Sequence, residues 1–124
     1  DDINMKLKHF DQDGHLLWEC YPEGDHAFVD PWEVTLTKDD QYAVTDRSLR
    51  TIKVFTRNGE YVREFGSKQL LSAWGIACNS QGHLVVTDAV QKSVFVYDSE
   101  GKVLFSLPNK THNDPHLFKC PEYV

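Results

Sequence analysis

Aspartates are the first candidates for chemistry, because paired carboxylates can act as general acids and bases. Asp46 and Asp88 each close a Val-Thr-Asp tripeptide, and they stand 42 positions apart. An acid that recurs at one place in a repeated pattern indicates a structural role rather than a catalytic one. We therefore expect Asp46 and Asp88 to be structural, and we predict no catalytic residue.

The segment from Asp11 to Gly14 begins like a calcium loop, in which oxygen ligands stand at alternate positions. The rest of the twelve-residue ligand set, with its terminal glutamate, is missing. The same turn recurs from Thr56 to Gly59 without an acid, so the geometry of a hairpin explains the pattern better than a metal does. We expect no calcium at this turn.

The histidines and cysteines do not suggest a zinc centre. His112 and His116 have the spacing of ligands on one helical face, but Pro115 between them forbids a regular helix. The other four histidines are scattered through expected strands and turns: His9, His15, His26 and His83. The three cysteines form no CxxC pair, which favours reduced thiols: Cys20, Cys78 and Cys120. We predict no bound metal and no cofactor.

Basic and aromatic residues are the stronger candidates for binding. Four cations and two tryptophans stand in loops or at the starts of strands: Arg47, Arg50, Lys68, Lys92, Trp32 and Trp74. Cations beside aromatic side chains suit single-stranded RNA, whose bases stack and whose phosphates pair with positive charge. The structural alternative is that both tryptophans pack between neighbouring sheets.

The net charge of -6 opposes a diffuse basic surface of the kind that binds nucleic acid through phosphates alone. A local basic patch remains an alternative, because five cations fall within one stretch: Arg47, Arg50, Lys53, Arg57 and Arg63. The sequence has no apolar run of about 18 residues, so no membrane partner is expected.

A repeat positions these residues. Three copies of one pattern keep a spacing of 13 between an aspartate and a glycine, with an aromatic residue between them. The copies are Asp1, Phe10 and Gly14, then Asp46, Phe55 and Gly59, then Asp88, Tyr97 and Gly101. A period near forty residues indicates a propeller or a solenoid.

Short strands explain the repeat better than helices do. Alternating apolar and polar residues arrive at roughly ten-residue intervals between turns rich in Gly, Asp and Asn. Each full repeat predicts four antiparallel strands, which is the composition of a propeller blade. The expected fold is therefore all-β, with two whole blades and two partial ones.

The expected blades divide the chain into four parts. Residues 1–21 are the second half of a blade, 31–66 and 73–107 are whole blades, and 118–124 are the first strand of another. Such a fragment cannot close a ring, so we expect the remainder of the propeller to come from the same chain or another. Alternating strand directions place the loops 46–51 and 88–92 on one rim with the loops between blades.

The residue pattern of the repeat resembles the NHL repeat over nearly the whole chain. The first copy carries Pro-Trp-Glu-Val at 31–34, Val-Thr-Asp-Arg-Ser at 44–48, Ile-Lys-Val-Phe at 52–55 and Glu-Phe-Gly at 64–66. The second copy follows the same order from Trp74 to Leu107. Two positions depart from the motif, since Glu33 replaces its usual glycine and Ala73 its usual proline.

The resemblance implies a function as well as a fold. It also implies that Asp46 and Asp88 brace the loop after their strand, through hydrogen bonds from backbone amides to their carboxylates. The Pro-Trp and Asp-Arg-Ser motifs are most similar to the sequences of the propellers at the C-terminus of tripartite-motif (TRIM) ubiquitin ligases. Some of those propellers bind RNA and others bind proteins. It implies a cytoplasmic, non-catalytic recognition scaffold that binds RNA or a protein segment through one rim. The alternative is a fragment of an NHL-type metalloenzyme such as a peptide-amidating lyase, for which the histidines offer no visible ligand set.

Overall fold

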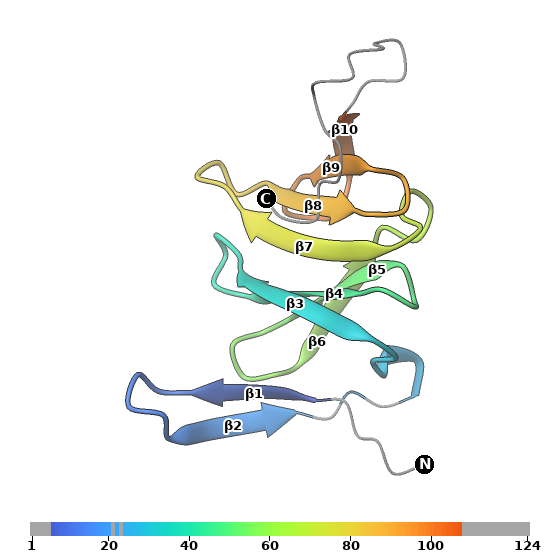
Figure 1. Ribbon diagram of the computed structural model, residues 1–124. Coiled ribbons are helices and arrows are strands. Elements are labelled where there is room, and N and C mark those ends of the chain that lie inside the picture. The colour runs from blue at the N-terminus through green and yellow to red at the C-terminus, as the bar shows by residue number, and fades with distance from the viewer. Residues whose placement is uncertain (1–5, 21, 23, 108–124) are drawn as a thin grey trace.

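The computed structural model describes residues 6–20, 22 and 24–107. These residues form ten strands and one short 3-10 helix, η1, at Gly24–His26 (Figure 1). The all-β fold predicted from the repeat is confirmed, and the strands pair as antiparallel meanders. The predicted opening strand at 118–124 and the loop before it lie outside the described residues.

The first two strands form a hairpin, and the next eight form two four-stranded sheets. The hairpin joins β1 (Leu7–Phe10) to β2 (Leu16–Cys20). The first sheet contains β3 (Pro31–Leu36), β4 (Tyr42–Asp46), β5 (Thr51–Phe55) and β6 (Tyr61–Phe65). The second contains β7 (Ala73–Cys78), β8 (Leu84–Asp88), β9 (Ser93–Tyr97) and β10 (Val103–Leu107). Both sheets keep sequence order across their strands.

The two sheets stack face to face, with β7 against β3 and β4 (Figure 1). Apolar side chains fill the space between them because period-two alternation sends one set from each strand to this side. The buried cluster takes Ala43, Ile52 and Val54 from the first sheet and Ile76, Leu84, Val86, Phe95 and Tyr97 from the second. A smaller cluster joins Phe28, Val44 and Phe55 on the other face of the first sheet, with Leu7 of the hairpin against it.

Polar bonds also join the two sheets near their inner strands. The Glu33 carboxylate accepts a 2.8 Å hydrogen bond from the backbone N–H of Ile76. The Thr45 hydroxyl donates to the Trp74 carbonyl at 2.7 Å. The register of β7 with β8 is interrupted between Ala73 and Ile76. Glu33, the residue that departs from the motif's glycine, therefore reaches the next sheet beside this irregularity.

We expect Glu33→Ala to lower the free energy of unfolding by about 1 to 3 kcal/mol, because the Ile76 amide loses a charged acceptor at a sheet interface. Urea denaturation followed by tryptophan emission measures the change. Glu33→Gln keeps a side-chain oxygen acceptor, so its free energy of unfolding should lie between those of the wild type and Glu33→Ala. Glu60→Ala is the matched control, since Glu60 is exposed. Equal losses at both sites would contradict an inter-sheet role for Glu33.

Candidate ligand-binding rim

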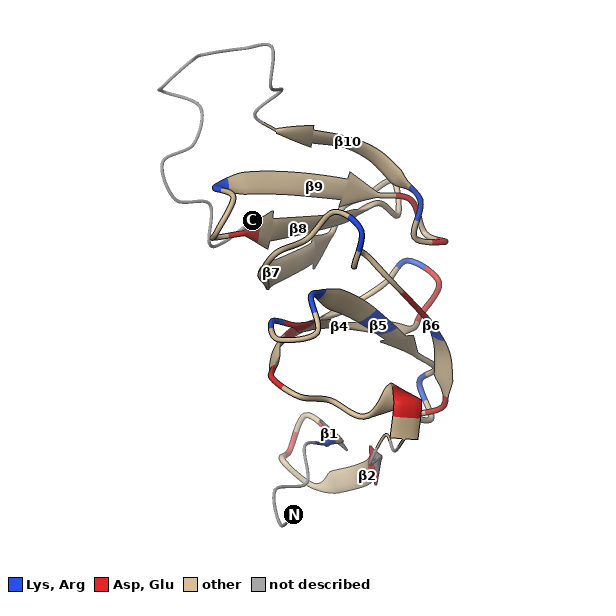
Figure 2. Ribbon diagram, turned by 90° about the vertical axis from the view of Figure 1, so that its right-hand side faces the viewer, with Lys and Arg blue, Asp and Glu red and all other residues tan. Residues whose placement is uncertain are grey.

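The candidate site is the end of the sheets at which β4 and β8 finish. We call the rim the described loop residues at this end: 27–30, 46–50, 66–72 and 88–92. Figure 2 views the molecule from this side, where basic segments lie on the loops that follow β4 and β8. Backbone contacts join the loops, since the Arg47 N–H donates to the Asp30 carbonyl at 3.0 Å. The loop before β3 and the loop after β4, two of the loops that the sequence assigned to one rim, therefore lie together.

Asp46 holds the first part of the rim. Its side chain is fully buried, and its carboxylate accepts hydrogen bonds from the backbone N–H groups of Val29 at 2.8 Å and Asp30 at 3.0 Å. A third bond comes from the N–H of Leu49 at 3.2 Å. The carboxylate thus joins the loop before β3 to the loop after β4, and its oxygens are occupied by the backbone.

Asp88 does the same in the second sheet. Its buried carboxylate accepts hydrogen bonds from the N–H groups of Leu71 at 2.7 Å and Ser72 at 3.2 Å. The backbone and side-chain amides of Gln91 donate to it at 3.0 and 2.8 Å. Burial raises the pKa of the Tyr97 hydroxyl, and the Asp88 charge adds to this. Both aspartates are braces, with no free oxygen for proton transfer to a ligand.

Arg47 is engaged by an acid and two aromatic rings. Its Nε donates to the Asp30 carboxylate at 2.9 Å. Its guanidinium carbon lies 3.8 Å from the ring centroid of Trp32 and 4.8 Å from that of Trp74. The two indole centroids are 5.0 Å apart, so Trp32 and Trp74 do pack between neighbouring sheets. This cluster fixes the rim in place by a paired cation–π contact.

The other three rim cations are exposed. No described residue forms an ion pair with Arg50, Lys68 or Lys92. The rim contains three acids: the two buried aspartates, whose oxygens bond to backbone amides, and Asp30, which pairs with Arg47. The exposed rim charges at Arg50, Lys68 and Lys92 are all positive, on a chain whose net charge is -6.

Arg50 and Lys92 occupy equivalent positions, and both have left-handed backbones. Their φ angles are +60° and +52°, a region that glycine and asparagine adopt more readily than long side chains. Each residue closes the turn after its aspartate, and the Arg50 N–H donates to the Asp46 carbonyl at 2.9 Å. The turn geometry therefore favours glycine or asparagine at two places where this sequence has cations.

The sequence analysis missed three exposed apolar side chains on the rim. Val29, Leu71 and Val90 are 51%, 49% and 63% exposed, on loops that the two buried aspartates brace. Trp32 is 49% exposed. Exposed apolar residues have no signature in a single sequence, because loops and strand ends also contain buried ones. They give the rim a mixed basic and apolar surface.

The other cations of the first repeat do not join the rim. Lys53 is fully buried in β5 and pairs with Glu64 at 3.3 Å. Arg57 pairs with Asp40 at 2.8 Å in the turns at the other end of the strands. Arg63 donates to the Ser99 carbonyl at 3.2 Å. The five cations that are close in sequence are thus dispersed, because alternate strand residues face opposite sides of a sheet.

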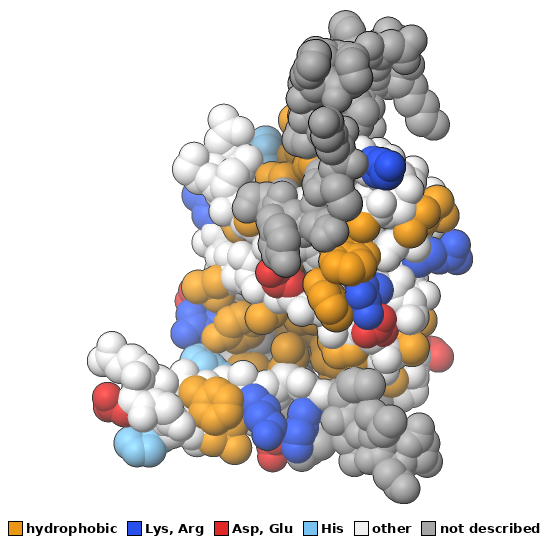
Figure 3. All heavy atoms as spheres, viewed as in Figure 1, with side chains coloured by type: hydrophobic (Ala, Val, Ile, Leu, Met, Phe, Trp, Pro, Cys, Tyr) orange, Lys and Arg blue, Asp and Glu red, His pale blue; other side chains and the backbone are white. Residues whose placement is uncertain are grey.

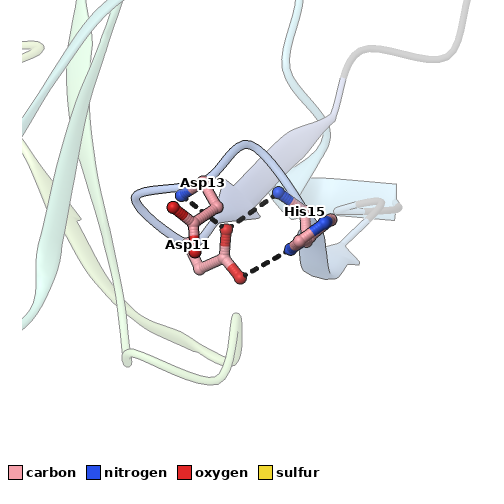
Figure 4. Close-up of side chains that lie close together, drawn as sticks. All are labelled: Asp11, Asp13 and His15. Atoms are coloured by element: carbon pink, nitrogen blue, oxygen red, sulfur yellow. Dashed lines mark hydrogen bonds and ion pairs between the residues drawn. The ribbon is translucent and has the colours of Figure 1, made fainter.

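Asp11, Asp13 and His15 cluster at the tip of the hairpin (Figure 4). Their potential ligand atoms lie within 4.8 Å of one another, an arrangement found once among the described residues. Asp11 accepts bonds from the N–H groups of Asp13 and His15, both at 2.9 Å. The His15 backbone bond is the main reason why the pKa of the Asp11 carboxyl is lowered. The acid is therefore occupied in closing the turn.

The same bonding recurs in other turns, whatever the residue type. The Thr56 hydroxyl accepts from Asn58 and Glu60, and the Asn79 amide oxygen accepts from Gln81 and His83. Asp98 accepts from the residues two and four positions on, and the backbone bond from Lys102 lowers the pKa of its carboxyl. Turn closure thus accounts for the Asp11 cluster, as the repeated pattern suggested.

Comparison with known proteins places the repeat among NHL proteins, although no protein-family model matches the chain. It is 25% identical over its whole length to the protein brain tumor of Drosophila melanogaster. It is 34% identical over 78% of its length to the human E3 ubiquitin-protein ligase NHLRC1. The chain spans only 11% and 25% of these two relatives. No described helix is long and apolar enough to cross a membrane.

Solved structures support the same fold. The virginiamycin B lyase of Staphylococcus aureus superimposes with a TM-score of 0.68 and 19% identity, over 85% of this chain and 35% of that one. At this identity the likeness concerns the fold, in which repeated four-stranded sheets stack around an axis. Together with the sequence relatives, it identifies the chain as part of a β-propeller of the NHL type.

Proposed function

We propose that the rim binds single-stranded RNA and that the chain is a non-catalytic recognition scaffold. The observation that carries this proposal is the pair Arg50 and Lys92, two exposed cations at equivalent left-handed positions. A left-handed non-glycine residue costs of order 1 to 3 kcal/mol, so retention of long basic side chains at both sites suggests use in binding. Phosphates of a nucleic acid are the partners that such unpaired cations suit.

The remaining rim residues fit the same ligand. Lys68 adds a third exposed cation from the loop before β7. Leu71, Val90 and the exposed part of Trp32 offer apolar surface for unstacked bases. Arg47 acts as a positioning residue here, because Asp30 and the two indoles already occupy its guanidinium.

The printed names of two relatives support a proposal about the larger protein. One is named as an E3 ubiquitin-protein ligase and another as a B-box type zinc finger protein. We propose that this propeller is the recognition part of a TRIM-type ligase in the cytoplasm, with catalysis carried by another domain. We further propose that residues 31–66 and 73–107 are two whole blades and that 1–21 is the second half of a preceding blade, while the predicted strand at 118–124 lies outside the described residues.

Asparagine substitutions test the proposal without loss of the fold. We expect Arg50→Asn with Lys92→Asn and Lys68→Gln to weaken binding of random-sequence single-stranded RNA by about 10 to 100-fold. Fluorescence anisotropy at several salt concentrations measures the affinity. The slope of log affinity against log salt should fall by about two units, because three phosphate contacts at about 0.7 each are lost. Stability should hold or rise, since asparagine tolerates the left-handed turn.

The control variant also removes three positive charges, but at the opposite ends of the strands. Lys38→Gln, Arg57→Gln and Lys102→Gln alter the turns at the other ends of the strands, and they should leave RNA affinity nearly unchanged. An equal loss in both triple variants would indicate diffuse electrostatics and contradict a rim site. A rim variant that loses a protein partner while the wild type binds no RNA would establish the protein alternative. Stoichiometric zinc in the purified protein would instead favour the lyase-like reading.

A further inference from the structure

The loop that carries Lys68 has an equivalent in the first repeat. Residues 66–72 lead into β7 as residues 24–30 lead into β3, and matching positions are 42 apart. In both loops the carbonyl of the opening glycine accepts from the N–H three positions on, at 3.0 Å in the second repeat and 3.2 Å in the first. Both loops are also bonded to the buried aspartate of their sheet. The two loops therefore have the same backbone framework.

A polar network occupies positions of the second repeat that are apolar in the first. The side-chain amide of Gln91 donates to the Gln69 carbonyl at 2.7 Å and to the Asp88 carboxylate at 2.8 Å. The fully buried Tyr97 hydroxyl donates to the side-chain oxygen of Gln69 at 3.3 Å. Gln69, Gln91 and Tyr97 thus differ as a set from their three equivalents in the first repeat, which are Ala27, Leu49 and Phe55.

The framework of the loop does not require this network. The first repeat forms the same loop with apolar side chains, where the rings of Phe28 and Phe55 lie 5.5 Å apart between centroids. Replacement of a complete buried polar set by well-packed apolar side chains is often neutral for stability. Three polar side chains at the second loop therefore indicate a need for one defined loop position rather than for added stability.

The two loops also differ at the position of Lys68. Its equivalent is His26, whose ring stacks on Tyr61 with centroids 3.6 Å apart. Lys68 is exposed, and the equivalent of Tyr61 is Val103, which offers no ring for stacking. Basic side chains stand out along the rim end of the molecule, at the right of Figure 3. The second loop thus presents a cation to solvent at the position where the first loop is anchored by stacking.

Gln69 supplies the anchor that this position lacks. Its N–H donates to the Gly66 carbonyl, its own carbonyl accepts from Gln91 and its side-chain oxygen accepts from Tyr97. A residue that is bonded at three atoms cannot rotate its backbone without breaking those bonds. The backbone of the neighbouring Lys68 is therefore held as well.

We propose that Gln69, Gln91 and Tyr97 are positioning residues that hold Lys68 outward for a phosphate of the ligand. This inference rests on the RNA binding proposed above and adds the residues that arrange the site beforehand. A cation whose loop is already ordered loses less conformational freedom on binding, so its contact contributes more to affinity. Arg50 and Lys92 need no such network, because each lies in a short turn between two paired strands.

An exchange of the whole set for the residues of the first repeat tests the proposal. We expect Gln69→Ala with Gln91→Leu and Tyr97→Phe to speed tryptic cleavage after Lys68 by more than about tenfold, because the loop opens more often. Affinity for random-sequence single-stranded RNA should fall by about two- to fivefold in anisotropy titrations at low salt. The urea midpoint should be nearly unchanged, because the first repeat already uses the introduced set.

Each measurement has its own control. In the same digest, cleavage after Arg50 should keep its rate, since that turn belongs to the first sheet. In a Lys68→Gln background the exchange should cause no further loss of RNA affinity, because the cation that the network positions is gone. Gln91→Leu alone should give most of the faster cleavage after Lys68, since Gln91 makes the two shorter bonds. This single variant decides the matter if the triple variant folds poorly.

Unchanged cleavage after Lys68 in both variants would overturn the proposal. Faster cleavage with wild-type RNA affinity would also overturn it if Lys68→Gln lowered that affinity, because the order of the loop would then not matter for binding. A wild-type protein without RNA affinity would contradict the proposed function and with it the phosphate ligand. The cleavage rates would then still decide whether the network holds the loop.

Discussion

Replacing Asp88 by alanine is expected to lower the free energy of unfolding by about 3 to 5 kcal/mol. The substitution leaves the amides of Leu71, Ser72 and Gln91 without their acceptor at a site from which water is excluded. Because small domains are stable by only about 5 to 15 kcal/mol, this loss is a large fraction of the total stability, and the urea midpoint should fall markedly. Urea denaturation with circular dichroism measures the loss.

The control variants for Asp88→Ala distinguish the loss of hydrogen-bond acceptors from the loss of a negative charge. Asp39→Ala removes an exposed acid and should change stability by less than about 0.5 kcal/mol. Asp46→Ala should resemble Asp88→Ala, because its carboxylate accepts three backbone bonds in the equivalent place. Asp88→Asn keeps one oxygen acceptor, so it should lower the free energy of unfolding by less than Asp88→Ala does. A stable Asp88→Ala protein would show that the loops hold without the brace.

The structural role of the aspartates could be predicted from the sequence because it is repeated, but the prediction named only the following loop. Each carboxylate also braces the loop before its sheet, from which Val29 and Leu71 donate across 17 positions. The strands themselves follow from period-two alternation between turns with glycine at positive φ, such as Gly59 at +89°. Local signals of this kind survive in a single sequence, and the whole β architecture rests on them.

The arrangement of the rim could not be read in the same way. Arg47 meets Trp74, which belongs to the next repeat, and that contact depends on how the sheets stack. Lys53, one of the five cations from which the sequence allowed a basic patch, lies buried in β5 and pairs with Glu64 at 3.3 Å. The left-handed backbone of Arg50 depends on the turn type, and no glycine or asparagine marks it. These properties come from tertiary geometry.

Gly101→Ala is the second substitution with a large expected effect. Gly101 lies in the turn between β9 and β10 with φ of +96°, where a side chain strains the backbone by about 1 to 3 kcal/mol. An added Cβ would also lie 2.6 Å from ring atoms of Phe65 and 2.9 Å from its Cβ. Phe65 belongs to the first sheet and its ring is 5.0 Å from that of Tyr97, so it has little room to move.

The clash with Phe65 should lower the free energy of unfolding by a further amount of about 1 to 3 kcal/mol, because a packed interface tolerates extra volume poorly. Gly14→Ala isolates this contribution, since Gly14 has a similar φ of +90° and nothing lies within 4 Å of its added Cβ. We therefore expect Gly101→Ala to lower the melting temperature well beyond Gly14→Ala in parallel thermal scans. In a Phe65→Ala background the added loss from Gly101→Ala should be smaller, because alanine lacks the Cγ and Cδ1 atoms that lie 2.6 Å from the new Cβ. Equal losses at the two glycines would mean that the turn conformation alone matters and that the sheets can move apart at Phe65 without cost.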